Sequence, residues 1–194
     1  MGKYFRLLFV FSIVLMVPFL CQAFDQWPDT GQTNSYTDTF GEDSDYTINP
    51  PSYTKLGFNG VEFPVTATPA TGWIMTKDNV TGLIWEMKTN DGSIHDVDNK
   101  YTWYDSNSDT NGGNSGTDGD GTDTEDFINA LNNESFGGFN DWRLPTVKEL
   151  SAILNSNMSD PCINTNFFPN NSVQFYWSST TAAVTSCRVS SLDP

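Results

Sequence analysis

The chain has 194 residues and a formal net charge of −15 at pH 7, with 24 acidic against nine basic residues. An acidic excess of this size repels polyanions, whereas nucleic-acid binders carry an excess of Lys and Arg for phosphate contacts. It excludes nucleic acid, and disfavours anionic membranes and sulfated glycans, as general partners. An acidic surface keeps an exported protein soluble, and cation binding is the alternative interpretation of the same charge.

The first 23 residues are predicted to be a removable signal peptide. Lys3 and Arg6 form a short basic region, an apolar run extends from Leu7 to Leu20, and Ala23 is the small residue that signal peptidase prefers. The apolar run is shorter than the roughly 20 residues that a helix needs to cross a bilayer. We expect cleavage near Ala23, no transmembrane segment afterwards, and a secreted, periplasmic or cell-surface protein. A permanent anchor or lipid attachment at Cys21 is the alternative.

Cleavage would leave 171 residues with a net charge of −17, because the signal carries two basic residues and no acidic one. That length fits one domain, and all six Trp lie in it and supply a large area for burial. Cys162 and Cys187 remain as an even pair, so a disulfide between them is a candidate in an oxidising compartment. His95 is the only histidine, which argues against a zinc site, and we expect it to be exposed in a loop.

Residues 24–63 are predicted to be an extended lead-in segment and residues 64–194 the domain proper. The lead-in is rich in Thr, Asn, Asp, Pro and Tyr and lacks periodicity. Its acidic cluster Gly41-Glu42-Asp43-Ser44-Asp45-Tyr46 either faces water or binds a cation. Two β-prone runs follow at 73–76 and 83–87, and the turn residues between them indicate a hairpin.

A further short strand is expected at residues 101–104, followed by a long surface loop. From Asp105 to Asp123 the chain is almost wholly Asp, Asn, Gly, Ser and Thr, a composition that cannot bury itself. Its oxygen-bearing side chains suit calcium, although the spacing does not match an EF-hand. The candidate ligands are Asp105, Asn107, Asp109, Asp118, Asp120 and Asp123. A solvated acidic loop without metal is the alternative.

Two helices are predicted next. Thr122 and Glu125 form a capping-box pattern at the start of the first, and Gly137-Gly138 end it. Thr146 and Glu149 form the same pattern at the start of the second, which ends near residue 155. The apolar stripe of the second helix is Val147, Leu150, Ile153 and Leu154. An irregular aromatic loop at 164–169 and a strand at 175–180 complete an α+β protein.

The order of these features resembles the Lcl C-terminal domain family. Two motifs carry the resemblance: Asp141-Trp142-Arg143-Leu144-Pro145-Thr146 with Glu149-Leu150, and Tyr176-Trp177-Ser178-Ser179-Thr180. The run Asp78-Asn79-Val80-Thr81-Gly82-Leu83-Ile84-Trp85 supports it. That family is similar to the C-type-lectin-like and formylglycine-generating-enzyme folds, which implies a small twisted antiparallel sheet with two helices. The implied structural residues are Trp85, Trp142, Arg143, Leu144, Pro145 and Trp177, with Arg143 facing a buried carboxylate.

Members of the family usually continue past the Trp-Ser-Ser motif with further strands. We therefore expect the last strands of the sheet to be missing here, the domain to be C-terminally incomplete, and its folding to be impaired.

The resemblance implies adhesion and, for some members, the binding of sulfated polysaccharides. The charge of −17 argues against that ligand and favours a neutral glycan or a protein surface. No enzymatic activity is expected, because neither Cys162 nor Cys187 has an activating neighbour and the acidic pairs lie in a Gly-rich loop. The alternative is a structural or vestigial exported protein with no dedicated ligand.

Overall fold

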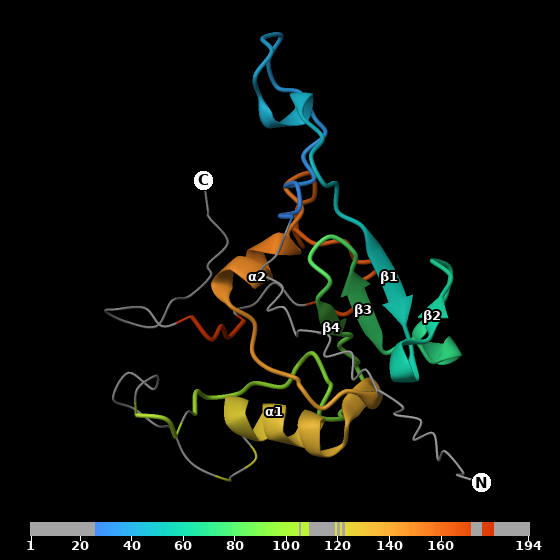
Figure 1. Cartoon of the computed structure of the whole chain (residues 1–194), viewed down its shortest axis with the longest axis vertical. Coiled ribbons are helices and arrows are strands. Elements are labelled where there is room, and N and C mark those ends of the chain that lie inside the picture. The colour runs from blue at the N-terminus through green and yellow to red at the C-terminus, as the bar shows by residue number, and fades with distance from the viewer. Residues whose placement is uncertain are drawn as a thin grey trace, which may run out of the picture.

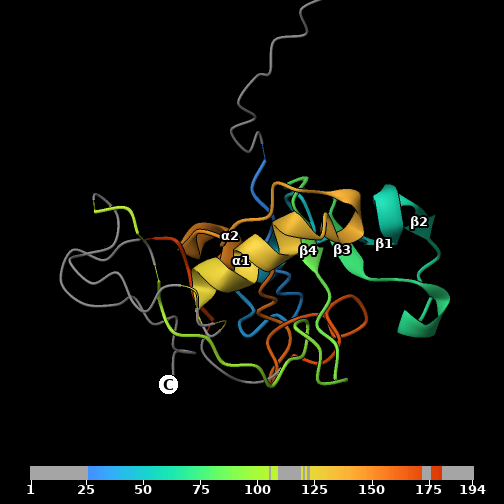
Figure 2. The same ribbon diagram turned by 90° about the horizontal axis from the view of Figure 1, so that it is seen from below.

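The protein is described by a computed structural model over residues 26–104, 106–108, 119, 121, 123–171 and 176–180. Its centre is a four-stranded antiparallel sheet, and helices α1 (Thr124–Asn133) and α2 (Val147–Ala152) lie at the β4 end of it (Figures 1 and 2). The predicted α+β class is confirmed. Within the described ranges, no helix has the length and apolar character needed to cross a membrane.

The sheet order is β2-β1-β3-β4, with β1 at Tyr53–Leu56, β2 at Glu62–Phe63, β3 at Met75–Asp78 and β4 at Ile84–Glu86. The predicted hairpin is confirmed, because β3 and β4 pair with Met75 opposite Glu86 and Lys77 opposite Ile84.

Asp78 closes the turn of this hairpin. Its buried carboxylate accepts hydrogen bonds from the Val80 N–H at 2.9 Å and from the Thr81 hydroxyl at 2.7 Å. Aspartate favours such turns because its side chain can bond to the backbone two residues on.

Strands β1 and β2 lie within residues 24–63, which were predicted from the sequence to be an extended lead-in segment. That interpretation is wrong for these strands, because β1 pairs with β3 along its whole length at the centre of the sheet. Strand β1 could not be predicted from its hydrophobic pattern, because one of its buried residues is a lysine. Lys55 is 5% exposed, its Nζ donates to the Ala67 carbonyl at 2.7 Å, and it lies 3.9 Å from the centroid of a Trp73 ring. The indole face stabilises the buried ammonium, although burial lowers the pKa of Lys55.

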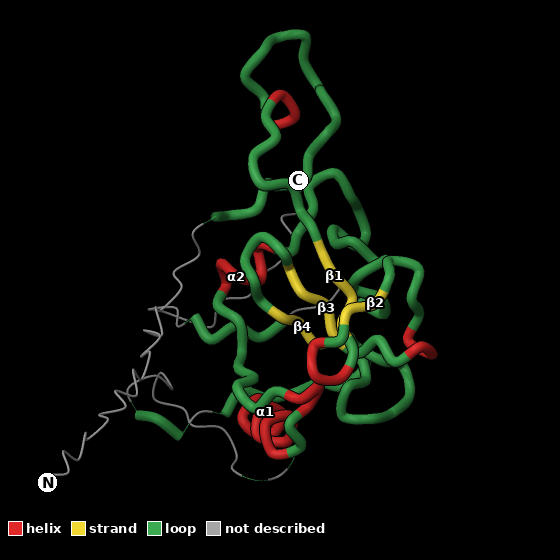
Figure 3. The backbone as a smooth tube through the Cα atoms, turned by 45° about the vertical axis from the view of Figure 1, so that its right-hand side comes forward, coloured by secondary structure: helices red, strands yellow, loops and turns green. Residues whose placement is uncertain are grey.

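Residues 26–52 form a long loop that projects from the sheet on the side away from α1 (Figures 1 and 3). The predicted acidic cluster lies here and holds the turns of the loop. The Glu42 carboxylate accepts hydrogen bonds from the N–H groups of Tyr36 and Thr37, and that of Asp45 accepts one from Gly41. The base of the loop is fixed where the Ser156 N–H donates to the Thr30 carbonyl at 2.8 Å.

Helix α1 is capped by Asp123, whose carboxylate accepts a hydrogen bond from the Asp126 N–H at 2.9 Å. The cap therefore lies one residue beyond the predicted Thr122. The side chain of Leu131 is buried. The chain then turns sharply through Gly137, whose φ of +65° is left-handed and whose α-carbon lies against the fully buried Met75.

Helix α2 has the predicted capping box at Thr146 and Glu149 but is shorter than predicted. It ends at Ala152 because Leu154 pairs with Ile163 in an isolated antiparallel bridge. Leu154 is consequently exposed. The predicted strand at 101–104 is also wrong, since it contributes a single bridge, and residues 176–180 form no strand.

The aromatic loop predicted at 164–169 is confirmed. Phe168 is buried, and its ring meets that of Tyr53 edge-on with the centroids 5.1 Å apart. The Thr76 hydroxyl donates to the Phe167 carbonyl at 2.7 Å. These contacts join the loop to strands β1 and β3.

Candidate functional site

Two tryptophans that are far apart in the sequence meet at the surface. The ring centroids of Trp103 and Trp177 are 5.8 Å apart and the rings are inclined by 45°. Trp177 is 39% exposed, although it is held in place by a 2.8 Å hydrogen bond from its Nε1 to the Tyr101 carbonyl. We call these two residues the tryptophan pair. An exposed and immobilised indole surface of this kind suits a ligand with an apolar face.

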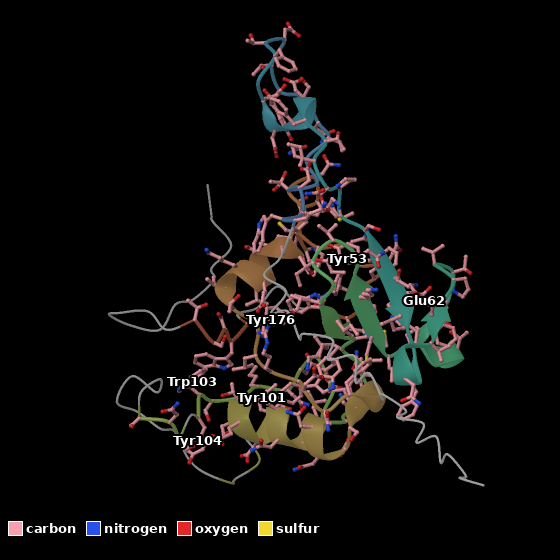
Figure 4. The ribbon with its side chains drawn as sticks, viewed as in Figure 1. Tyr53, Glu62, Tyr101, Trp103, Tyr104 and Tyr176 are labelled. Carbon is pink, nitrogen blue, oxygen red and sulfur yellow. The ribbon has the colours of Figure 1, made fainter. Side chains whose placement is uncertain are left out.

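A shallow hollow of about 250 Å³ adjoins the pair. Trp103 belongs to both features. The walls come from three segments, with Trp103 and Tyr104 on one side, Glu125 and Ile128 of α1 on another, and Arg143 and Leu144 on the third. Figure 4 shows Trp103 and Tyr104 beside the N-terminal end of α1.

Backbone contacts hold the aromatic wall against α1. Thr102 forms a parallel bridge with Asp123, and the Thr124 N–H donates to the Thr102 carbonyl at 3.0 Å. The Tyr104 N–H in turn donates to the Thr124 hydroxyl at 3.2 Å. The start of α1 therefore sets the position of Trp103.

Arg143 brings a paired charge to the opposite wall. Its guanidinium forms two hydrogen bonds with Glu149, whose side chain is 5% exposed whereas that of Arg143 is 56% exposed. The hydrogen bonds from Arg143 lower the pKa of the Glu149 carboxyl to about 2, and the same pairing raises the pKa of Arg143. The pair is therefore ionised and neutral overall at physiological pH.

Of the six predicted structural residues, four belong to the segment 141–146, Trp177 lies in the segment 176–180, and Trp85 lies in β4. The Trp142 Nε1 donates to the Phe136 carbonyl at 3.0 Å, and the Pro145 carbonyl accepts from the Ser179 N–H at 2.9 Å. Trp142, Leu144 and Pro145 are half-buried, as is Trp85, whose indole nitrogen is buried without a hydrogen-bond partner. Trp177 and Arg143 differ from these four because both are exposed.

The two motifs of the sequence resemblance lie in the wall at 141–146 and in the segment 176–180, which contacts that wall. Residues 74–192 match the Lcl C-terminal domain family. The chain belongs to this family. The match begins one residue before β3, so β1 and β2 precede the part of the chain that matches. No curated protein and no solved structure matched the chain.

In this Lcl C-terminal domain, two of the six predicted calcium ligands are described. Asn107 is exposed and Asp123 is buried, with one carboxylate oxygen engaged in capping α1 and the other without a hydrogen-bond partner. Asp105, Asp109, Asp118 and Asp120 lie outside the described residues. The part that is described contains no group of three His, Cys, Asp or Glu residues arranged to hold a metal. Calcium binding therefore stays a prediction.

His95 is not the exposed loop residue that the sequence suggested. Its side chain is 17% exposed, its Nδ1 lies 2.6 Å from Glu86 Oε1, and its ring stacks on Phe136 with the centroids 4.3 Å apart. The polar loop folds back because the Asp96 carboxylate accepts hydrogen bonds from the N–H groups of Gly92 and Asp98. These contacts also lower the pKa of Asp96.

Three further predictions fall outside the described residues and stay predictions. They are the signal peptide at 1–23, the pairing of Cys187 with the exposed Cys162, and the incomplete end after residue 180.

Trp103, Tyr104 and Glu125 were not predicted as site residues from the sequence. A usable signal was present, because three aromatic residues within 101–104 border a polar loop. A short aromatic run at such a border indicates a surface cluster as readily as a strand.

Proposed function

We propose that this chain is an exported binding module that recognises a glycan through the tryptophan pair and the adjoining hollow. The observation that carries the proposal is Trp177, which remains 39% exposed while it contacts Trp103 and is fixed by Tyr101. The C–H face of a pyranose ring is apolar and can pack on an indole, and a few polar groups then orient its hydroxyls.

The hollow supplies such polar groups beside the aromatic surface. Arg143 presents N–H donors, and the Glu125 carboxylate presents oxygen acceptors. The fold places these groups on two separate segments, α1 and residues 141–146, so one sugar ring on Trp103 would be within reach of donors and acceptors on two sides. This combination is typical of a small-ligand site.

The test is a glycan array probed with the purified secreted protein. We expect binding to at least one glycan, with Trp103→Ala and Trp177→Ala each reducing the signal about tenfold or more, since a stacked aromatic contributes on the order of 1–3 kcal/mol. Trp27→Ala is the matched control, because Trp27 is 43% exposed but lies in the projecting loop. Binding that survives both substitutions would refute the site, and N-terminal sequencing of the secreted protein tests cleavage near Ala23.

A separate observation favours the second candidate, recognition of a protein surface. The projecting loop exposes Tyr36 and Phe40 at 75% each and Ile48 at 64%. The Phe40 ring also contacts that of Tyr46, with the centroids 5.5 Å apart, and contiguous exposed apolar surface of this kind marks protein contacts. A protein ligand would be lost in Phe40→Ala and retained in Trp103→Ala, the reverse of the pattern expected for a glycan. Absence of any ligand would favour the structural or vestigial alternative.

A further inference from the structure

We infer that the hollow selects a sugar that carries a free amino group, so that the ligand is a cationic amino-sugar polymer. This inference rests on the proposed glycan-binding function and names the ligand class of the same site. It is carried by the one carboxylate among the described residues that line the hollow, Glu125, and by the pairing of the charges next to it.

Glu125 is the unpaired charge among the described walls of the hollow. It lies in the first turn of α1, is half-buried, and makes no hydrogen bond or ion pair with any described residue. Its neighbours on the helix are engaged, since Asp123 caps α1 and the Asp126 carboxylate accepts the Gly121 N–H at 2.7 Å. A half-buried carboxylate gains most from a ligand that brings a positive charge.

Arg143 does not offset this negative charge. Both of its terminal nitrogens are bonded to Glu149, so its charge is neutralised before any ligand arrives. An anionic sugar would meet Glu125 with no free cation among the described walls of the hollow to compensate it. A neutral sugar can donate hydroxyl hydrogen bonds to Glu125 but leaves its negative charge uncompensated, which is costly for a half-buried carboxylate.

An ammonium group is also compatible with the aromatic wall. A cation within about 6 Å of an indole centroid is attracted by the ring face. The same pairing occurs inside this protein, where Lys55 Nζ lies 3.9 Å from the Trp73 ring. The hollow therefore offers an amino sugar a carboxylate at Glu125 and an indole at Trp103.

The net charge of the whole chain also favours a cationic ligand. A net charge of −15 raises the local concentration of a polycation and repels sulfated polysaccharides. Long-range attraction is lost at high salt, whereas a half-buried contact with Glu125 is screened less.

The experiment measures binding of two oligosaccharides of equal length, a glucosamine hexamer with free amines and its fully N-acetylated counterpart, at a pH at which the amines are protonated. We expect the wild-type protein to prefer the amine form by about tenfold, as for a half-buried charge pair. Glu125→Gln should remove most of this preference while binding of the acetylated form is kept. Glu134→Gln is the matched control, because it removes the same charge from the C-terminal end of the same helix.

Each outcome decides a separate point. Equal binding of the two oligomers, or an equal effect of Glu125→Gln and Glu134→Gln, would overturn the inference and leave glycan binding in place. Failure of every glycan, here and on the array, would overturn the proposed function itself. Unchanged melting temperatures of the two variants would show that neither effect comes from unfolding.

Discussion

Arg143 and Glu149 are joined by two parallel hydrogen bonds, from Nη1 to Oε2 at 2.9 Å and from Nη2 to Oε1 at 2.6 Å. Glu149 Oε2 also accepts the Thr146 N–H at 2.7 Å. One buried carboxylate thus closes the capping box of α2 and fixes a residue that lines the hollow. Because Arg143 lies in the segment 141–145 and Glu149 lies in α2, the ion pair joins this wall of the hollow to the helix that follows it.

Arg143→Met is expected to lower the free energy of unfolding by about 2–3 kcal/mol, because it leaves the Glu149 carboxylate buried without its partner. Adding Glu149→Gln should restore part of that loss, which a double-mutant cycle from urea unfolding would measure as a coupling of about 1–2 kcal/mol. Lys148→Met is the control, since Lys148 is exposed and its side chain makes no hydrogen bond or ion pair with a described residue. An effect of Arg143→Met no larger than that of Lys148→Met would contradict the prediction.

The same pair predicts the stability of the protein in acid. Hydrogen bonds from Arg143 lower the pKa of Glu149 from 4.5 to about 2. Because the folded-state pKa lies below the unfolded value, the contribution of Glu149 is complete at neutral pH and is lost as the pH falls from about 5 toward 2. Unfolding measured across this range should show a smaller loss of stability in Glu149→Gln than in wild type. Parallel curves would mean that other carboxylates account for the acid sensitivity.

Gly137→Ala should destabilise the protein by about 2–4 kcal/mol, because it combines a left-handed φ with overlap on a packed side chain. A Cβ at this position would overlap the side chain of Met75, which is fully buried. Gly92→Ala separates the two effects, since Gly92 has a φ of +73° but no atom within 4 Å of an added Cβ. Thermal unfolding that shifts equally in both variants would assign the whole cost to backbone conformation.

The calcium hypothesis predicts that millimolar CaCl₂ raises the melting temperature, since a ligand that binds only the folded state stabilises it. Asp123→Asn is the informative variant because asparagine also caps helices well but removes the carboxylate charge. Stabilisation in wild type, and a smaller one in Asp123→Asn, would place Asp123 at the site. A melting temperature that calcium does not raise, or raises no more than magnesium, would favour the solvated loop without metal.

Features that depend on neighbouring residues in the chain were predictable from the sequence. The β3–β4 hairpin follows from two β-prone runs around an Asp-bearing turn, and the capping box of α2 follows from the spacing of Thr146 and Glu149. Strand β1 was not predictable in this way. Its buried Lys55 is acceptable only because Trp73 and the Ala67 carbonyl surround it, and neither lies near it in the chain.

The candidate site likewise depends partly on local sequence and partly on tertiary contacts. The sequence by itself determined the α+β class, the motifs at 141–146 and 176–180 that mark the family, and an acidic charge that disfavours polyanions. Only the tertiary structure placed Trp103 against Trp177 and left Glu125 without a partner among the described residues. Local propensity and capping act over a few residues, whereas side-chain exposure and pairing are decided by segments that folding brings together from more than 70 residues apart.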